Sequence, residues 1–244
     1  MQVTAGTRAL VTGATRGIGR ALAEALAANL PGEHHALACD VVQADAIRAA
    51  VDRFASATGG LELVVANAGV THYGPFGEQP LADALEMSAV NWHGTLFTVQ
   101  AALPHLLDGG RGHIAVVSSG AALRSFPSAA VYGATKAAQR MLAEALRHEL
   151  SGTGVSVTTV FPGEIATGLH DHERERLPAW YRTDRLGDPA ALAAAILDGV
   201  ERDARAVFFP RAVRALGALH GLSPRAADAA LRALRGETAA PRRG

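Results

Sequence analysis

The chain lacks a disulfide, an excess of either charge and any long apolar run. Its 244 residues include one cysteine, Cys39, so no intramolecular disulfide can form, which fits a reducing compartment. The 23 basic residues balance the 23 acidic ones, which argues against general nucleic-acid binding. No run approaches the roughly 20 apolar residues of a membrane-spanning helix, and residues 1–4 do not open a secretory signal. We therefore expect a cytoplasmic protein.

The length and a hydrophobic content of 49% favour one large folded unit. We expect a single domain over residues 1–235 and a disordered tail over 236–244. Residues 207–219 have the pattern of a strand followed by a basic amphipathic helix. This helix can pack against the domain or lie on an anionic membrane, with Arg211 and Arg214 near the lipid. We favour packing and expect no membrane contact.

A glycine-rich turn follows an apolar run over residues 7–11, which is typical of a buried parallel strand. A helical pattern comes next, because leucines recur at positions 22, 26 and 30. Strand, glycine turn and helix form the context of a dinucleotide site, where free N–H groups at the helix N-terminus face the phosphates. Gly13 permits the tight turn, Gly17 lets the backbone approach a pyrophosphate, and Gly19 lets the helix pack on the strand.

Further apolar runs predict more strands with polar or glycine-rich ends. They cover residues 34–39, 61–66, 112–119, 155–161 and 207–210. Ligands of doubly wound sheets bind at the carboxyl ends of the strands. The sequence therefore predicts an α/β protein whose site lies where these strands end.

Tyr132 and Lys136 stand four residues apart, so on a helix they share one face. A lysine ammonium beside a tyrosine favours the phenolate and lowers the tyrosine pKa from its ordinary value of about 10. This pair predicts an acid/base that works near neutral pH.

The ordered set of motifs resembles the short-chain dehydrogenase/reductase family over residues 7–210. In order, it comprises Thr12-Gly-x-x-x-Gly-x-Gly19, Asp40-Val41, Asn67-Ala-Gly69, Asn91, Ser119, Tyr132-x-x-x-Lys136 and Pro162-Gly163-x-x-x-Thr167. The resemblance implies a single-domain Rossmann-like fold with a doubly wound parallel sheet. It also implies an oxidoreductase that transfers hydride between a nicotinamide cofactor and a ketone or secondary alcohol, which can be an apolar molecule.

By the same resemblance, four residues carry the chemistry. Tyr132 is the proton donor in reduction and the base in oxidation, and Lys136 holds the nicotinamide ribose and lowers the tyrosine pKa. Ser119, selected over Ser118 by its spacing to the tyrosine, hydrogen-bonds the substrate oxygen. Asn91 holds a water that links the lysine to solvent as a proton relay.

The resemblance further implies which residues contact the cofactor, while no metal is expected. Asn67, Ala68 and Gly69 line the adenosine ribose. The nicotinamide carboxamide and the pyrophosphate meet Pro162, Gly163, Ile165 and Thr167. The glycine turn contributes Gly13, Thr15, Arg16, Gly17, Ile18 and Gly19, and the next turn contributes Asp40 and Val41.

The chain departs from the family between Gly19 and Asp40, which are only 21 positions apart. The first helix uses most of this length, and a strand–helix–strand unit needs roughly 30 residues. The second strand and its helix are therefore missing, which leaves six strands, and we expect residues 36–41 to pair directly with residues 7–12. Asp40 would then lie near the adenosine ribose and favour NAD, whereas Arg16 would meet the 2′-phosphate of NADP. Between these we favour NADP(H) over NAD(H).

Residues 168–185 occupy the place of the family's substrate lid. Trp180 and Tyr181 can cover an apolar substrate or anchor the lid, and the 71–75 segment is expected to border the cleft. His170 and His172 with Asp171 could suggest a metal site, but the stretch fits a charged, solvated lid helix better.

Two further expectations concern assembly and alternatives. Helices over 81–107 and 130–150 commonly pack across a two-fold axis in this family, which implies a homodimer or homotetramer. The competing hypothesis is a catalytically silent binding or scaffold protein, because the lost unit would weaken adenosine binding. A third is an artificially truncated sequence, which would leave a strongly exposed sheet edge.

Overall fold

One parallel sheet forms the centre of the protein. The computed structural model describes residues 1–29, 34–169, 171, 175–176 and 186–235. The strands are β1 (Ala9–Val11), β2 (Leu63–Ala66), β3 (Gly112–Val117), β4 (Val155–Pro162) and β5 (Ala206–Phe209). They lie in the order β1-β2-β3-β4-β5, and every neighbouring pair is parallel. The predicted single-domain, Rossmann-like α/β architecture is confirmed.

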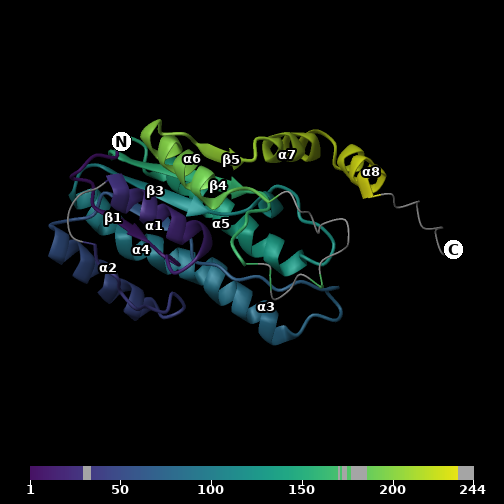
Figure 1. Cartoon of the computed structure of the whole chain (residues 1–244), viewed down its shortest axis with the longest axis horizontal. Helices are drawn as coiled ribbons and strands as arrows, with labels where there is room; N and C mark the ends of the chain where they lie inside the picture. The colour runs from purple at the N-terminus through teal and green to yellow at the C-terminus, as the bar shows by residue number, and fades with distance from the viewer. Residues whose placement is uncertain (30–33, 170, 172–174, 177–185, 236–244) are drawn as a thin grey trace.

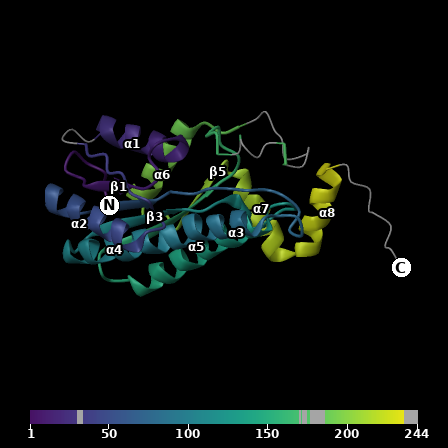
Figure 2. The same ribbon diagram turned by 90° about the horizontal axis from the view of Figure 1, so that it is seen from below.

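Helices cover both faces of the sheet, which gives three layers (Figure 2). One face carries α1 (Gly17–Asn29) and α6 (Pro189–Glu201), and the other carries α2 (Ala44–Thr58), α4 (Gly94–Asp108) and α5 (Ala130–Glu149). A π-helical turn (Ser88–His93) joins α3 (Leu81–Met87) to α4, and a short 3-10 turn (Gly120–Ala122) follows β3. The last helices, α7 (Ala212–Leu222) and α8 (Pro224–Arg235), extend beyond the end of the sheet (Figure 1).

Alternation along the strands builds a core on each face of the sheet. In β2, Leu63 and Val65 pack with α1 and α6, while Val64 and Ala66 pack with α2, α4 and α5. All four of these side chains are buried, as expected for a parallel strand covered on both faces. The two cores fix the strand ends relative to one another, and so they fix the residues that follow those ends.

The sixth predicted strand is absent, which corrects the expectation that residues 36–41 pair with residues 7–12. Residues 34–40 form no strand, and β1 pairs only with β2, so it is an edge of the sheet. Most of this segment is exposed, and Cys39 packs instead on the core beside α2 and α4. His34 and His35 line a groove together with Ala9 and Val11, so a hollow lies where the expected ladder of hydrogen bonds would be.

A groove of about 630 Å³ runs beside the free edge of β1, between α1 and α2. The Thr12 N–H donates to the Val65 carbonyl, and the Arg8 carbonyl accepts from the Leu63 N–H. Backbone groups of a strand alternate in direction, so those of Ala9 and Val11 face the groove. The strand deletion therefore leaves a hollow along the sheet rather than a closed edge.

Helix α7 packs against the loop that follows β3. A Cβ atom added at Gly217 would meet the Leu123 side chain at 2.9 Å, and one at Gly120 would meet Val213 at 3.2 Å. This close approach agrees with the expectation that the helix packs on the domain. Among the described helices, none is both long and apolar enough to cross a membrane.

Candidate active site

A cleft of about 270 Å³ opens at the carboxyl ends of β1 to β4. It is lined by Gly13, Thr15, Arg16, Gly17, Ile18, Asn67, Ala68, Gly69, Val70, Val117, Ser118, Ser119, Tyr132, Lys136, Pro162, Gly163, Ile165, Thr167 and Leu169. Most residues of the sequence-predicted site thus meet at one place, although they come from five separate segments of the chain.

The glycine turn after β1 forms one wall of the cleft and is closely packed. Gly13 and Gly17 have φ angles of 66° and 58°, where a side chain would be strained. The Asn67 amide donates to the carbonyl of Thr12 at 2.9 Å, which ties the turn to the end of β2. Helix α1 begins at Gly17, so its first N–H groups are available to an anion in the cleft.

Gly19 does not line the cleft but supports the turn from behind. A Cβ atom there would lie 2.3 Å from the Gly13 carbonyl oxygen. We predict that Gly19→Ala lowers stability by about 1–3 kcal/mol, because the turn must move to admit the methyl group, and that nucleotide binding falls with it. Thermal unfolding and calorimetric titration with NADPH measure the two effects.

Gly77→Ala is the matched control for this change, because nothing lies within 4 Å of a Cβ atom added at Gly77. Unchanged stability and affinity in Gly19→Ala would show that the turn is not packed as described.

Tyr132 and Lys136 lie one turn apart on α5 and both reach the cleft. The side chains are buried, and the Lys136 ammonium donates to the Val117 carbonyl at 3.1 Å. Its nitrogen is 5.8 Å from the centre of the Tyr132 ring. Lys136 is the only lysine of the chain, so this ammonium has no equivalent elsewhere.

Burial sets the protonation of this pair. It lowers the pKa of Lys136 from 10.5 to about 7. It also raises the pKa of Tyr132 above its ordinary value of 10.0, while a hydrogen bond with Ser119 acts in the opposite direction. This corrects the expectation that the lysine lowers the tyrosine pKa, because desolvation of the buried phenol dominates here.

The two serines after β3 have different roles in the structure. Ser118 donates its hydroxyl to the Lys136 carbonyl at 2.8 Å, which anchors α5 to the sheet. Ser119 is hydrogen-bonded to the Tyr132 side chain, and its hydroxyl also accepts from the Ala121 N–H at 3.1 Å. The geometry therefore agrees with the choice of Ser119 as the serine beside the tyrosine.

Asn91 lies behind the cleft rather than in its lining. It is fully buried within the π-helical turn, where its side chain holds both the N–H and the carbonyl of Val70, at 2.8 and 3.0 Å. Its amide also donates to the Thr135 hydroxyl on α5. π-helical turns occur often at functional sites, and this one joins the cleft wall to the helix of Tyr132.

Besides Gly19, two further predicted cofactor contacts, Asp40 and Val41, do not line the cleft. Asp40 is exposed, and its carboxylate accepts from the Val42 N–H at 3.1 Å. Val41 packs against Gly94 at the start of α4. The loss of the strand next to β1 explains this placement, because nothing holds the turn at 40–41 beside the glycine turn.

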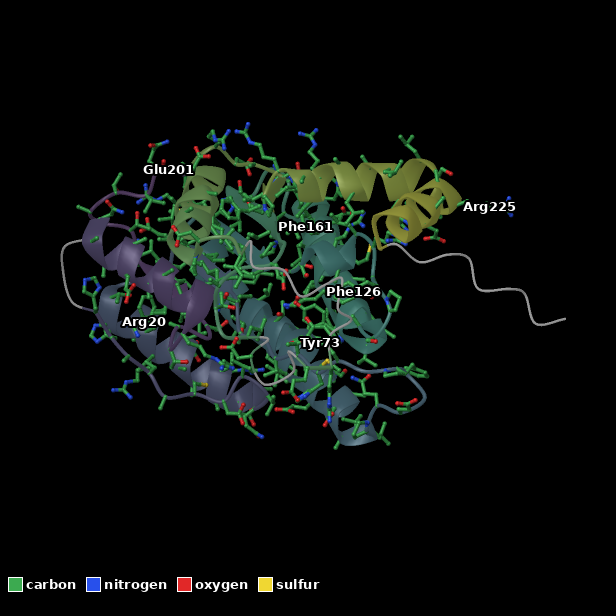
Figure 3. The ribbon with its side chains drawn as sticks, turned by 45° about the vertical axis from the view of Figure 1, so that its right-hand side comes forward. Arg20, Tyr73, Phe126, Phe161, Glu201 and Arg225 are labelled. Carbon is green, nitrogen blue, oxygen red and sulfur yellow. The ribbon has the colours of Figure 1, made fainter. Side chains whose placement is uncertain are left out.

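Sequence reasoning missed an aromatic group that packs against Tyr132. Tyr73 is buried, and its ring centre lies 6.1 Å from that of Tyr132 and 6.1 Å from that of Phe126 (Figure 3). The segment 71–75 therefore packs an aromatic ring against Tyr132. Tyr73 and Phe126 are far apart in the sequence, so only the fold brings them together.

Much of the predicted lid lies outside the described residues, including His170, His172, Trp180 and Tyr181, as does the predicted tail 236–244. Within the described part of the chain, no three histidine, cysteine, aspartate or glutamate residues gather as metal ligands would.

Comparison with known proteins identifies relatives. A family model described as short chain dehydrogenase matches residues 27–178. A D-threitol dehydrogenase of Mycolicibacterium smegmatis is 34% identical over 218 residues, which cover 78% of this chain and 84% of that protein. A short chain dehydrogenase of Burkholderia cenocepacia, solved in complex with NADP, is 28% identical with a TM-score of 0.80, over 96% of this chain and 98% of that one. A short chain dehydrogenase/reductase of Burkholderia phymatum, solved with NAD, has a TM-score of 0.82 at 24% identity, over 92% of this chain and 96% of that one.

Proposed function

Because this chain belongs to the short-chain dehydrogenase family and is an oxidoreductase, we propose that it interconverts a ketone and a secondary alcohol with a nicotinamide cofactor. One observation carries the proposal: buried Tyr132 and Lys136 line the same cleft as the glycine turn. An acid/base and a phosphate-binding turn are the two parts that such a reaction needs from the protein.

The cleft fits a dinucleotide on the side of the glycine turn. A Cβ atom at Gly17 would lie 2.8 Å from the Thr167 side chain, so only glycine lets the turn and Thr167 come together at this wall of the cleft. The N–H groups of α1 and the Thr167 hydroxyl would hold phosphate oxygens, and Asn67 to Gly69 would hold the adenosine ribose. When bound, the nicotinamide supplies or accepts the hydride.

Tyr132 would supply the proton. Its raised pKa keeps the phenol protonated at neutral pH, so it can donate to a carbonyl oxygen that becomes an alkoxide. Ser119, bonded to the same tyrosine, would donate a second hydrogen bond to that oxygen. In the direction of oxidation the phenolate must form, and it gains most when Lys136 carries its proton.

Lys136 would hold the ribose hydroxyls of the nicotinamide and return a proton to Tyr132 after turnover. With a pKa of about 7, it can exchange protons at neutral pH. The Asn91 side chain and the Lys136 nitrogen both border the space beside Gly69. Asn91 would hold there the water through which the proton passes to solvent.

Arg16 supports a preference for NADP(H) over NAD(H). It lies exposed at the edge of the cleft and makes no ion pair with the described part of the chain. Arg20, one turn further along α1, is paired with Glu24 at 2.8 Å. An unpaired guanidinium beside the adenosine ribose would form charge-assisted hydrogen bonds with a 2′-phosphate.

We predict that Arg16→Ser weakens NADPH binding by roughly tenfold or more and leaves NADH binding unchanged, because a hydrogen bond to a charged group contributes about 1.5–3 kcal/mol. Titration of each cofactor into each variant measures this. Arg20→Ser is the control and should bind both cofactors like the wild type. Equal losses for NADPH and NADH in Arg16→Ser would remove this residue from phosphate recognition.

Calorimetric titration with NADPH and NADH tests the proposed function itself, followed by a panel of ketones and secondary alcohols. Micromolar binding with turnover of at least one ketone is the expected result. The alternative is a catalytically silent scaffold. It is supported by the groove beside β1 and by the absence of Asp40 from the cleft lining. Failure to bind either cofactor would favour that alternative.

Assembly as a homodimer or homotetramer is part of the proposal. Large apolar side chains stay exposed on the helices expected to pack across a two-fold axis. They are Leu81 and Leu85 on α3, Leu107 on α4 and Met141 on α5. Covering such side chains is a common reason for symmetric association.

A further inference from the structure

Gln139 is a fully buried polar side chain that the reaction outlined above does not use. It lies on α5 seven residues after Tyr132 and three after Lys136, and so on the same face of the helix. Its amide nitrogen donates to the Asn91 main-chain carbonyl at 2.9 Å and to the Thr95 hydroxyl at 2.6 Å. Gln139 therefore joins α5 to the π-helical turn and to the first turn of α4.

Stability alone gives a weak reason for a glutamine at this position. Its amide oxygen is buried without a hydrogen-bond partner in the described residues. A buried polar atom without a partner costs free energy, whereas a side chain of the same size without polar atoms would not incur that cost. The amide nitrogen, by contrast, is used fully, and its bond to the Asn91 carbonyl fixes the main chain at one particular residue.

From Asn91 a continuous set of buried hydrogen bonds leads to the cleft. The Asn91 side chain holds Val70, which lines the cleft, through both of its backbone groups. It also donates to the Thr135 hydroxyl, which in turn donates to the Tyr132 carbonyl. A Cβ atom at Gly69 would meet the Asn91 side-chain oxygen at 3.2 Å and the Lys136 nitrogen at 3.5 Å, so these two groups border the same small space.

We propose that Gln139 is a positioning residue that fixes Asn91 in the π-helical turn and, through Asn91, the Val70 wall of the cleft and the Tyr132–Lys136 face. A π-helical turn interrupts the regular i to i−4 hydrogen bonds of an α-helix, so the main chain there depends more on contacts from outside the helix. The Gln139 amide holds that main chain from outside the turn. The expected effect of Gln139 on turnover rests on the proposed function. Its expected effect on the order of the main chain at Val70 does not.

The variant Gln139→Met tests it, because methionine has a similar length and no donor. The matched control is Thr158→Val on β4. Thr158 is also fully buried, its hydroxyl donates to the Ala204 carbonyl and bonds to His113, and it does not line the cleft. Each change removes two buried hydrogen bonds and keeps the volume of the side chain close to the original.

The first measurement is hydrogen exchange at the Val70 amide, which donates to Asn91. Exchange at Val70 should be at least about tenfold faster in Gln139→Met and unchanged in Thr158→Val, because local opening follows the loss of local contacts. This measurement needs neither substrate nor cofactor, so it stands apart from the proposed function. Wild-type exchange at Val70 in Gln139→Met would overturn the inference.

The second measurement is a kinetic cycle with Asn91→Leu. We expect kcat/KM to fall roughly tenfold to a hundredfold in Gln139→Met, because small misplacements near the reacting atoms have effects of that size. If Gln139 acts through Asn91, the double variant should be no slower than Asn91→Leu alone. Additive losses, or a similar loss in Thr158→Val, would show that Gln139 only stabilises the fold. Absence of turnover in the wild type would reject the proposed function and leave the exchange result to judge Gln139.

Discussion

Replacing Tyr132 by phenylalanine should lower kcat by roughly 10²- to 10⁴-fold, the contribution that a positioned general acid makes. The ring would keep its contacts with Tyr73, because only the hydroxyl is removed. Lys136 bonds to the Val117 carbonyl and not to this hydroxyl, so its position should be kept as well. We therefore expect the affinity for NADPH to change by less than about threefold, a free-energy change below 1 kcal/mol. Steady-state kinetics and calorimetric titration separate the two effects.

The control for this prediction is Tyr73→Phe, the same chemical change on the ring packed beside Tyr132. Tyr73 is absent from the cleft lining, so turnover should stay near the wild-type value. Full activity in Tyr132→Phe would exclude this phenol as the proton donor. Equal losses in both variants would point to packing of the aromatic group instead.

Replacing Lys136 by methionine should stabilise the cofactor-free protein below neutral pH while it abolishes turnover. The lysine pKa is about 7 in the folded protein against an ordinary 10.5. Between these two values the unfolded chain binds a proton that the folded chain does not, so this residue destabilises the fold increasingly as the pH falls from 10.5 to 7. Below 7 the penalty is complete, on the order of a few kcal/mol.

The free energy of unfolding, measured by denaturant titration at several pH values, tests this sign. The gain of Lys136→Met over the wild type should be largest at pH values below 7 and disappear above 10.5. Because Lys136 is the only lysine of the chain, NMR of protein labelled at lysine reports its titration without overlap. A titration midpoint near the ordinary value, or a gain that does not depend on pH, would contradict the burial argument.

The same variant should lose affinity for nicotinamide cofactors, since the lysine is proposed to hold the ribose. Lys136→Met and Tyr132→Phe would then differ clearly: the first loses binding and turnover, and the second loses turnover alone. This contrast assigns the two roles without knowledge of the natural substrate.

Local spacing made most of the site predictable. The strand, glycine turn and helix over residues 7–29 follow from neighbouring residues, because tight turns and helical periodicity depend on a few positions in sequence. The same reasoning placed Tyr132 and Lys136 on one face of α5. The resemblance to the family, through its spacing to the tyrosine, selected Ser119 over Ser118, in agreement with the hydrogen bond between Ser119 and the tyrosine.

The expectations that failed depended on contacts between distant segments. The strand predicted over 34–39 has a suitable composition, but a strand forms only beside a partner, and the deletion removed that partner. The same loss explains why Asp40 lies outside the cleft. Gln139 was overlooked because a glutamine on a helix gives no sign of burial until the helix is packed against the π-helical turn.

The sequence by itself therefore determined the family and the parallel α/β plan, and it supplied the proposal for the reacting groups. Only the tertiary structure decided how those groups are protonated. The sequence pattern places a lysine beside a tyrosine, which in water would lower the tyrosine pKa. Packing of α5 against the sheet instead removes both side chains from water, and this desolvation lowers the lysine pKa and raises the tyrosine pKa. Spacing along a helix is a local property, whereas the dielectric environment depends on everything that packs around it.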